Sequence, residues 1–293
     1  AVARLFITAT GETCTGWLVG SEGHLLTNAH CIKTDKQAAT TDFELAAESV
    51  SCSQECQVLT GCGAGKLAAE TSELIAFDAK IDYALVKLKP SVDLSGYGHL
   101  SLRVSGPTQG EQVYVPQHPQ GWAKRIAAVD DLQNVTRIGG VSVTTLCGAG
   151  RVTYNADTRP GSSGSPVLAA SDNHVVALHS CGPGENESCK NSAVDIRTVI
   201  WDLRNKNVTL PDDAFTDPNG GIGEGPWIPG FGGEAPPVVT PAPSPALPAS
   251  ICRVFRPANC EIVSIGRCIV VNGACVPSPT YGATTPAPPA PTE

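Results

Sequence analysis

The sequence predicts an all-β protein, and two observations carry this prediction. From Ala1 to about Asn205 the chain is a series of short apolar or alternating runs, and Gly, Asn, Asp and Pro separate one run from the next. The runs are RLFIT, GWLVG, HLLTN, YALVKL, EQVYVP, VSVTTL, GRVTY, SPVLA and HVVALHS. Runs of this length with turn residues between them are typical of antiparallel strands, so we expect a sandwich or barrels.

One segment, residues 195–205, has helical periodicity instead. Its apolar side chains fall on one face of a helix, and they are Ile196, Val199, Ile200 and Leu203. Asp195 can accept hydrogen bonds from the first-turn amides as the N-cap. We therefore expect one helix at the C-terminal end of the strand-rich region.

Composition divides the chain into four parts, of which the strand-rich domain at residues 1–208 is the first. Residues 209–250 are rich in Pro and Gly and have almost no periodicity, so they are expected to form an extended linker. Residues 251–276 contain four cysteines. So short a unit needs staples to stay folded, and we expect a small module closed by two disulfides. Residues 277–293 are a Pro/Thr-rich tail.

Charge and hydropathy exclude several classes of partner. The net charge is -8 over 293 residues and the pI is near 5.3, which argues against nucleic acid and anionic membranes as partners. No apolar run approaches the roughly 18 residues needed to cross a bilayer. Ala1 does not open a charged segment followed by an apolar one, so we expect a mature chain whose signal peptide has been removed.

Cysteine usage indicates an oxidising compartment. The chain has 12 cysteines, and their spacings do not form paired C-x-x-C zinc knuckles. Three sequons of the Asn-x-Ser/Thr type lie at Asn134, Asn186 and Asn207. The sequence therefore predicts a secreted, extracellular glycoprotein with disulfide bonds.

Three separate segments supply the parts of a serine nucleophile. Residues 158–166, TRPGSSGSP, contain three serines and two glycines before an apolar run. A serine hydroxyl is a poor nucleophile until a base takes its proton, and a third group must orient that base. LLTNAHC places His30 after an apolar run, and AKIDYALVKLK places Asp82 at the start of an alternating strand, where a carboxylate without a partner is costly.

In the order His, Asp, Ser, these motifs resemble those of the chymotrypsin-like serine proteases. TNAHC is similar to the family's T-A-A-H-C, DYALVKL to D-I-A-L-L-K-L, and GSSGSP to G-D-S-G-G-P and G-N-S-G-S-P. The resemblance covers roughly residues 1–205. It implies two perpendicular, six-stranded antiparallel β-barrels with the active site in the cleft between them, followed by a C-terminal helix.

The resemblance also implies a role for each residue. Ser163 is the nucleophile, His30 is the general base and then the acid, and Asp82 fixes the imidazole tautomer. The backbone N–H groups of Gly161 and Ser163 form the oxyanion hole, and Gly161 lets the chain turn sharply with no side chain in the way. This chemistry needs no metal ion and no organic cofactor.

Within the family, the sequence departs from the digestive branch. Those enzymes pair a freed N-terminal amine with an aspartate just before the nucleophile, and here that position is Ser162. The ion pair cannot form. PGSSGSP, together with LHSCG, which places His179 sixteen residues after Ser163, instead resembles the lysyl and glutamyl endopeptidases.

The substrate pocket leaves two preferences open. The resemblance assigns it Asp157, Thr158, His179, Ser180 and Gly182. Asp157 matches the offset of the trypsin-like pocket carboxylate, which favours Arg or Lys before the scissile bond. Thr158 and His179 match the pair that holds a substrate carboxylate in glutamyl endopeptidases, although lysyl endopeptidases carry the same pair. Because Asp157 would repel glutamate, we expect cleavage after Arg or Lys, with a Glu-specific enzyme as the alternative; a third interpretation places Asp157 in the turn NADTRP facing solvent.

Cys14 and Cys31 match the family's histidine-loop disulfide. Closing a loop of that length stabilises a fold by roughly 3 kcal/mol in the chain-entropy model. Six further cysteines allow 15 pairings, and they are Cys52, Cys56, Cys62, Cys147, Cys181 and Cys189. A Cys181–Cys189 or a Cys147–Cys181 bridge would brace the pocket wall, and the sequence does not choose between them.

We therefore expect a secreted, monomeric serine endopeptidase that acts on protein or peptide substrates. One alternative is a non-catalytic inhibitor or decoy on the protease fold. A second is that the C-terminal module dominates and binds a cell-wall, polysaccharide or protein target. Phe255 is the module's only aromatic residue, which is little for a sugar-stacking surface.

Overall fold

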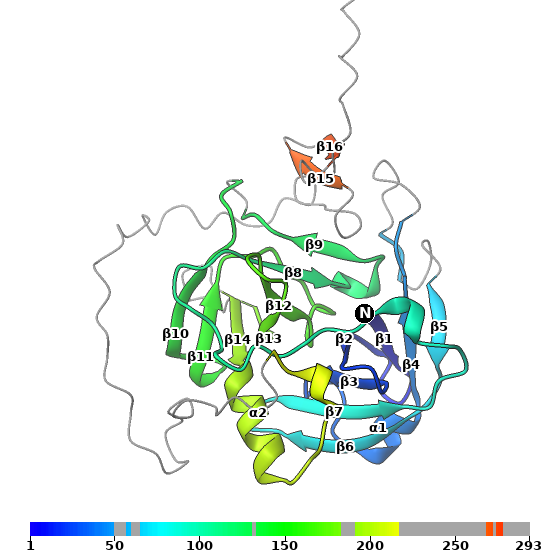
Figure 1. Cartoon of the computed structure of the whole chain (residues 1–293). Helices are drawn as coiled ribbons and strands as arrows, with labels where there is room; N and C mark the ends of the chain where they lie inside the picture. The colour runs from blue at the N-terminus through cyan, green and yellow to red at the C-terminus, as the bar shows by residue number, and fades with distance from the viewer. Residues whose placement is uncertain are drawn as a thin grey trace, which may run out of the picture.

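The computed structural model describes residues 1–49, 57–59, 65–130, 133–182 and 191–216, and the backbone of residues 268–271 and 274–277. Two antiparallel sheets dominate the described chain (Figure 1). The first is built from residues 2–88, blue to cyan, and the second from residues 113–195, green to yellow. The two sheets form neighbouring lobes, as expected for a double-barrel fold.

The first sheet has seven strands in the order β5-β4-β1-β2-β3-β7-β6. They are β1 (Val2–Ile7), β2 (Glu12–Val19), β3 (His24–Thr27), β4 (Thr41–Leu45), β5 (Lys66–Ala69), β6 (Ser72–Asp78) and β7 (Tyr83–Leu88). A short helix, α1 (Asp35–Ala39), connects β3 to β4. Its N-cap Thr34 accepts a hydrogen bond from the Gln37 amide, which satisfies a first-turn donor. The sheet closes around buried apolar side chains such as Leu5, Leu25 and Phe43.

The second sheet also has seven strands, in the order β10-β11-β14-β13-β12-β8-β9. They are β8 (Val113–Gln117), β9 (Arg125–Ala127), β10 (Ile138–Thr145), β11 (Gly148–Tyr154), β12 (Pro166–Ala169), β13 (Val175–Cys181) and β14 (Asn191–Asp195). Three 3-10 turns, η1 (Ser95–Tyr97), η2 (Pro119–Gly121) and η3 (Asp212–Ala214), lie in connections. Helix α2 (Ile196–Asn205) follows β14, and the Asp195 side chain caps it by accepting the Arg197 amide at 2.9 Å.

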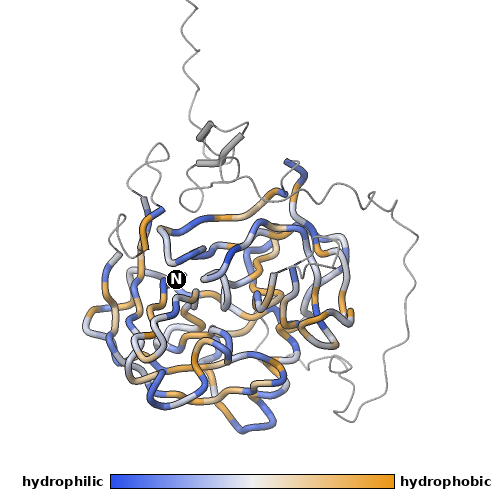
Figure 2. Tube along the Cα trace, turned by 180° about the vertical axis from the view of Figure 1, so that it is seen from behind, coloured by the Kyte–Doolittle hydropathy of each residue, from blue (hydrophilic) through white to orange (hydrophobic). Residues whose placement is uncertain are grey.

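A shared core joins the two lobes. Trp17 and Tyr83 of the first sheet pack in one cluster with Leu178 of the second sheet and Val199 of α2. Hydrophobic stretches run mainly through the interior, and hydrophilic stretches lie mainly at peripheral loops (Figure 2). Burial of apolar surface between the sheets therefore fixes the position of one lobe against the other.

The structure confirms the predicted all-β class with a C-terminal helix. Each sheet has seven strands where six were predicted. All nine quoted runs form strands. The two large sheets also contain five strands that none of these runs predicted, and they are β4, β5, β6, β9 and β14. Those five are short or lack clean alternation; β14, for example, is buried along its whole length although both of its ends are polar. No helix among the described residues has the length and apolar composition needed to cross a membrane.

The folded domain continues past Val208, the predicted boundary. Leu210 and Ala214 are buried in the shared core, and the Leu102 amide donates to the Ala214 carbonyl at 2.8 Å. The start of the predicted linker is therefore part of the domain, through Thr216. In the predicted C-terminal module, β15 (Cys268–Val271) and β16 (Ala274–Pro277) form an antiparallel pair. The rest of the linker, the module and the tail lies outside the described residues.

Candidate active site

His30 lies on the turn after β3, and its side chain is 49% exposed. Its Nδ1 lies 2.9 Å from Oδ2 and 3.1 Å from Oδ1 of Asp82, and its backbone amide donates to Oδ1 at 3.0 Å. An ionised carboxylate only accepts hydrogen bonds, so Nδ1 carries the ring proton. The neutral ring then has its free lone pair on Nε2, as a general base requires.

Asp82 stands just before β7 in the left-handed region, with φ at +73°. This conformation is uncommon for a non-glycine residue and must be held by its surroundings. The Asn28 side-chain amide donates to the Asp82 carbonyl at 2.8 Å, and the Asp82 amide donates to the Asp78 carbonyl at 2.8 Å. Asn28 is where TNAHC departs from T-A-A-H-C, so the sequence carried a signal for this contact.

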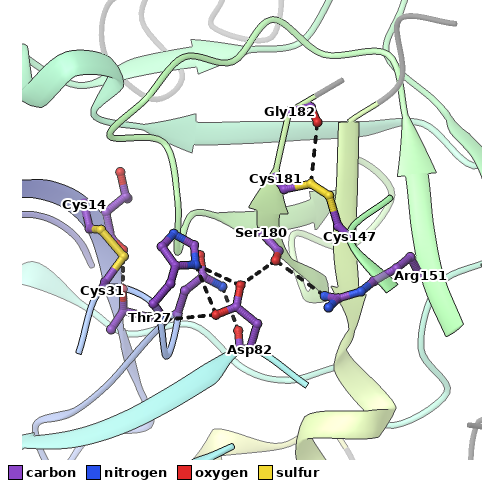
Figure 3. A network of polar contacts seen from close by, with 12 residues as sticks. Cys14, Thr27, Cys31, Asp82, Cys147, Arg151, Ser180, Cys181 and Gly182 are labelled. Carbon is purple, nitrogen blue, oxygen red and sulfur yellow. Dashed lines mark hydrogen bonds and ion pairs between the residues drawn. A yellow bond between two sulfur atoms is a disulfide. The ribbon is translucent and has the colours of Figure 1, made fainter. Parts of the chain in front are cut away.

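The Ser180 hydroxyl, on β13, donates to Oδ2 of Asp82 at 2.6 Å (Figure 3). Burial alone would raise the pKa of Asp82, but hydrogen bonds from His30 and Ser180 and the charge of His30 bring that pKa below its ordinary value. Ser180 was predicted to line the substrate pocket. In the structure its hydroxyl is hydrogen-bonded to the Asp82 carboxylate, and its place in the substrate pocket stays a prediction.

The serine-rich turn is held by both sheets. The Thr15 amide, on β2, donates to the Ser163 carbonyl at 2.8 Å, and the Gly164 amide donates to the His179 carbonyl, on β13, at 3.0 Å. Ser163 is half-buried. Within the described residues no hydrogen bond joins the Ser163 hydroxyl to the His30 ring. Such a bond is often long without substrate and tightens in the substrate complex.

The two flanking serines close this turn. The Ser162 hydroxyl accepts from the Arg159 amide at 3.1 Å, and the Ser165 hydroxyl donates to the Ser162 carbonyl at 2.6 Å. Both residues are buried. Their hydroxyls are committed to backbone groups, and Ser163 is the serine of the turn with a partly exposed side chain.

Gly161 has a backbone conformation and surroundings that exclude a side chain. Its φ is +93°, and a Cβ would lie 2.7 Å from the Gln120 nitrogen and 2.9 Å from the His118 oxygen. The Gln120 amide donates to the Pro160 carbonyl at 2.6 Å. The N–H groups of Gly161 and Ser163 donate to no acceptor within the described residues. Amide N–H groups inside a protein normally have an acceptor. Two N–H groups without one could therefore bind a developing oxyanion.

Two of the residues predicted for the substrate pocket, Thr158 and Gly182, lie beside the side chain of Asn191. The Thr158 hydroxyl donates to Oδ1 of Asn191 at 2.6 Å, and a Cβ on Gly182 would lie 3.9 Å from that same oxygen. Asn191 begins β14, and the sequence analysis did not assign it to the pocket. Asp157 is half-buried, and its carbonyl accepts from the Gln117 side chain at 2.6 Å.

His179, also assigned to the pocket, is buried beside Tyr154. The Tyr154 hydroxyl lies 2.5 Å from Nδ1 of His179. Burial, together with the charge of His30, lowers the pKa of His179 to about 3, and the charge of Asp82 opposes the shift. Burial also raises the pKa of Tyr154, so the phenol stays protonated and can donate. His179 is therefore neutral near pH 7.

Two disulfides brace the site. A disulfide joins Cys14 to Cys31, so it connects β2 to the turn that carries His30. Cys147 and Cys181 are bonded as well, so the turn between β10 and β11 is tied to the end of β13 (Figure 3). This is one of the two bridges that the sequence left open. The other four cysteines of residues 1–208 lie outside the described residues, and they are Cys52, Cys56, Cys62 and Cys189.

One cluster has the residue types of a metal site. Ligand atoms of Cys14, His30 and Cys31 lie within 4.8 Å of one another. Both sulfurs are bonded to each other, and Nδ1 of His30 is engaged by Asp82. The oxidised protein therefore has no free thiolate at this position to bind a metal ion.

Two supporting residues were missed because they lie on strands remote from the motifs. Thr15 donates through its hydroxyl to the Gly161 carbonyl at 2.9 Å. Arg151, on β11, donates to the Ser180 hydroxyl at 3.4 Å. For Arg151, the only signal was its place in the alternating run GRVTY, and that pattern alone does not show which face is buried.

One curated relative and one solved structure show what the chain is similar to. The Secreted RxLR effector protein 73 of Plasmopara viticola is 48% identical over 221 residues. The alignment covers 74% of this chain and 52% of the relative, so this chain spans about half of the relative's length. The HtrA-type protease AlgW with tripeptide matches at a TM-score of 0.51 and 18% identity, over 71% of this chain and 60% of that chain. At that identity the likeness concerns the fold alone.

The family match covers more than half of the sequence. Residues 14–178 match the family described as trypsin-like peptidase domain. This range contains the three motifs that resemble the chymotrypsin-like proteases, and the two antiparallel sheets agree with that fold. The chain therefore belongs to the trypsin-like peptidase domain family.

Proposed function

We propose that this protein is a secreted serine endopeptidase that cleaves peptide bonds through Ser163, His30 and Asp82. The hydrogen-bonded pair of His30 Nδ1 and Asp82 Oδ2, at 2.9 Å, is the observation that carries the proposal. A partly buried carboxylate beside an exposed imidazole, each in a turn next to a strand, serves no evident packing purpose, whereas a general base needs this arrangement. Secretion is inferred from the name of the relative and from the disulfides.

The reaction follows from this geometry in two halves. Ser163 Oγ attacks the substrate carbonyl while Nε2 of His30 takes its proton, and Asp82 stabilises the imidazolium that results. The amides of Gly161 and Ser163 bind the oxyanion. His30 then protonates the leaving amine, which departs and leaves an acyl-enzyme. In the second half, water attacks the ester while His30 takes its proton, and His30 then returns this proton to Ser163 Oγ as the acyl bond breaks and the carboxylic acid product leaves.

We propose Arg or Lys as the substrate residue before the scissile bond. Asp157 stands at the offset of a pocket carboxylate, and its half-buried position would make a cationic partner favourable. The glutamate alternative needs a group that attracts a carboxylate. Because the pKa of His179 is lowered to about 3, this ring supplies no positive charge near pH 7, and the Thr158 hydroxyl is already donated to Asn191.

Cleavage of a mixed peptide library with mass-spectrometric readout tests this function. The wild-type protein is expected to cut after Arg and Lys, and Ser163→Ala is expected to leave the library intact. Cuts after glutamate would transfer the assignment to the Glu-specific alternative. A variant that cuts as fast as wild type would refute Ser163 as the nucleophile.

The second candidate function is a non-catalytic protein on the protease fold, and the name of the relative, an effector, favours it. An effector can act by binding a host protein without cleaving it. This candidate predicts that the folded wild-type protein leaves every peptide of the library uncut. A role for residues 251–293 in binding polysaccharide is tested separately, by pull-down of the full chain and of a chain without them on insoluble polysaccharides.

A further inference from the structure

Arg151 places a buried positive charge near Asp82. The residue lies on β11, between β10 and β14, and is 5% exposed. Its Nη1 donates to the Ser180 hydroxyl at 3.4 Å (Figure 3). Burial lowers the pKa of Arg151, and the charge of Asp82 opposes that shift. Because a guanidinium remains protonated in proteins, the cation persists at every pH at which the protein folds.

Ser180 links Arg151 to Asp82 through two hydrogen bonds, and the donor and acceptor in each of them are fixed. A guanidinium has donors and no acceptor, so the Ser180 oxygen accepts from Arg151. The single hydroxyl hydrogen of Ser180 is then left for Oδ2 of Asp82, at 2.6 Å. Arg151 therefore selects the Ser180 orientation that stabilises the ionised carboxylate, and it adds a favourable charge on the same side.

We propose that Arg151 is a positioning residue for the peptidase reaction, which acts through Ser180 to keep Asp82 ionised and directed at His30. The inference rests on the proposed function and deepens it, because it names a fourth group on which the rate depends. Arg151 contacts neither substrate nor the reacting atoms in this account.

The other charged groups near Asp82 do not replace this cation. The His30 ring becomes positive when it accepts the serine proton, so its charge changes during the reaction. His179 of β13 is buried and neutral, since its pKa is lowered to about 3. Asp78, at the end of β6, is a second carboxylate and forms an ion pair with Lys206 at 3.8 Å. The arginine on β11 is thus the permanent positive charge that is linked by hydrogen bonds to the carboxylate.

Two substitutions separate charge from packing. Arg151→Met removes the cation and keeps an unbranched apolar stem, whereas Arg151→Lys keeps a cation. We expect Arg151→Met to lower kcat about tenfold with KM within about twofold. It should also move the acid limb of the kcat profile upward by about one pH unit, because loss of the nearby cation makes the hydrogen-bonded pair of His30 and Asp82 easier to protonate. Arg151→Lys is expected to recover most of kcat and the wild-type acid limb.

Arg103→Met is the matched control. Arg103 is also largely buried, but it pairs with Glu111 at 2.7 Å and with Asp172 at 2.8 Å. Its loss should lower Tm and leave the acid limb in place. A wild-type acid limb in Arg151→Met, with Tm lowered as in the control, would show a packing role and overturn the proposal. If Arg151→Met does not fold, Ser180→Ala must give the upward shift, and an unchanged limb there overturns it equally.

A second measurement is independent of turnover. The Nδ1 proton of His30 is expected to give a low-field ¹H resonance because it lies in a hydrogen bond to the Asp82 carboxylate, at 2.9 Å. The pH at which this resonance moves should rise by about one unit in Arg151→Met, and no change would overturn the inference. If the wild-type protein cleaves no peptide, the proposed function fails, while the resonance still decides the role of Arg151.

Discussion

Asp82 is the residue on which the polar contacts of the site converge. It accepts the His30 ring, the His30 amide and the Ser180 hydroxyl, and Asn28 holds its carbonyl. Burial would otherwise favour the neutral acid. These donors explain why the pKa of this partly buried carboxyl lies below its ordinary value, so that it can stabilise a positive imidazole at neutral pH.

The first prediction concerns this carboxylate. Asp82→Asn should lower kcat on the order of 10⁴-fold, because an amide in place of the acceptor allows the wrong imidazole tautomer. Ser163→Ala defines the floor, with a loss on the order of 10⁶-fold. Steady-state kinetics on a cleaved peptide, with circular dichroism to confirm folding, gives both values. Near-normal rates for Asp82→Asn would contradict the role of the aspartate.

Gly161 provides a prediction about the oxyanion hole. Gly161→Ala should lower kcat on the order of 10²-fold, because the methyl group would meet the Gln120 nitrogen at 2.7 Å and displace the amide. Gly110→Ala is the control, since Gly110 also has a positive φ, +83°, but nothing within 4 Å of its Cβ position. Equal losses in the two variants would mean that backbone strain, and not the oxyanion amide, sets the effect.

Residues within the motifs could be predicted from the sequence, and residues that support them could not. His30, Asp82 and Ser163 each lie in a local pattern of small and apolar neighbours. Arg151 lies in an ordinary alternating strand, and its contact with Ser180 depends on how β11 and β13 each pair with β14. Strand pairing is set by the whole sheet, so no window around Arg151 contains that information.

Among the elements, β13 serves both the site and the core. Successive side chains of a strand point to opposite faces, and here Ser180 reaches Asp82 while the buried ring of His179 meets Tyr154. The strand pairs with β12 and β14. A buried central strand holds both groups rigidly, which favours a preorganised site.

His179 predicts how stability depends on pH. Its folded pKa is about 3 against an ordinary value of 6.5, so the unfolded state binds more protons between these values and stability is lost as pH falls through this window. One such group contributes a slope of up to about 1.4 kcal/mol per pH unit. His179→Gln should reduce the slope of unfolding free energy between about pH 4.5 and 6.5.

Urea unfolding at several pH values measures that slope. The variant should keep some dependence on pH, because burial also lowers the pKa of His118 well below its usual value. Asp82 adds little in this window, since it protonates below its ordinary value of 3.8. A slope as steep in His179→Gln as in wild type would show that this histidine is not buried in its neutral form.

The disulfide beside His30 gives a prediction at the same scale. Cys14 and Cys31 are separated by 17 positions, so replacing both with serine should lower the free energy of unfolding by about 3 kcal/mol. The same replacement should also lower kcat, because the disulfide holds the turn that carries His30. Replacing Cys147 and Cys181 is the comparison, and it should affect KM more, because that bridge lies at the end of β13, beside the substrate pocket that we propose. Identical kinetic effects of the two pairs would contradict these separate roles.

Apart from the seven-residue β6, the helices and strands of residues 1–216 that the sequence analysis missed have five residues or fewer. Helix α1 has five residues, and β9 has three, so neither shows a full period of hydrophobic alternation. Their formation depends on tertiary contacts, as short elements gain little from intrinsic propensity. The ten-residue α2, with its apolar face and its Asp195 cap, was predictable within one residue.

At the scale of the whole molecule, the two sheets share a core to which the segment after α2 contributes. Leu210 and Ala214 pack there beside residues of both sheets. Composition alone suggested a linker from residue 209, because residues 209–250 are rich in Pro and Gly. The buried contacts of a few apolar residues outweigh that composition.

This packing predicts the minimal stable domain. A chain ending at Thr216 should keep the Tm and kcat of the full chain on a short peptide. A chain ending at Val208 should have a lower Tm, because it loses the burial of Leu210, which contributes about 1.5 to 3 kcal/mol, and the hydrogen bond from Leu102 to Ala214. Differential scanning calorimetry compares the three chains. Equal Tm values for the two shortened chains would show that residues 209–216 do not stabilise the domain.

Active-site labelling tests the central claim most directly. Diisopropyl fluorophosphate reacts with a serine that a neighbouring imidazole activates, and mass spectrometry of the digested protein locates the adduct. The account predicts one adduct per chain, on Ser163, that is absent in Ser163→Ala and forms much more slowly in His30→Ala. A folded wild-type protein that remains unlabelled, or that carries the adduct on another residue, would contradict it.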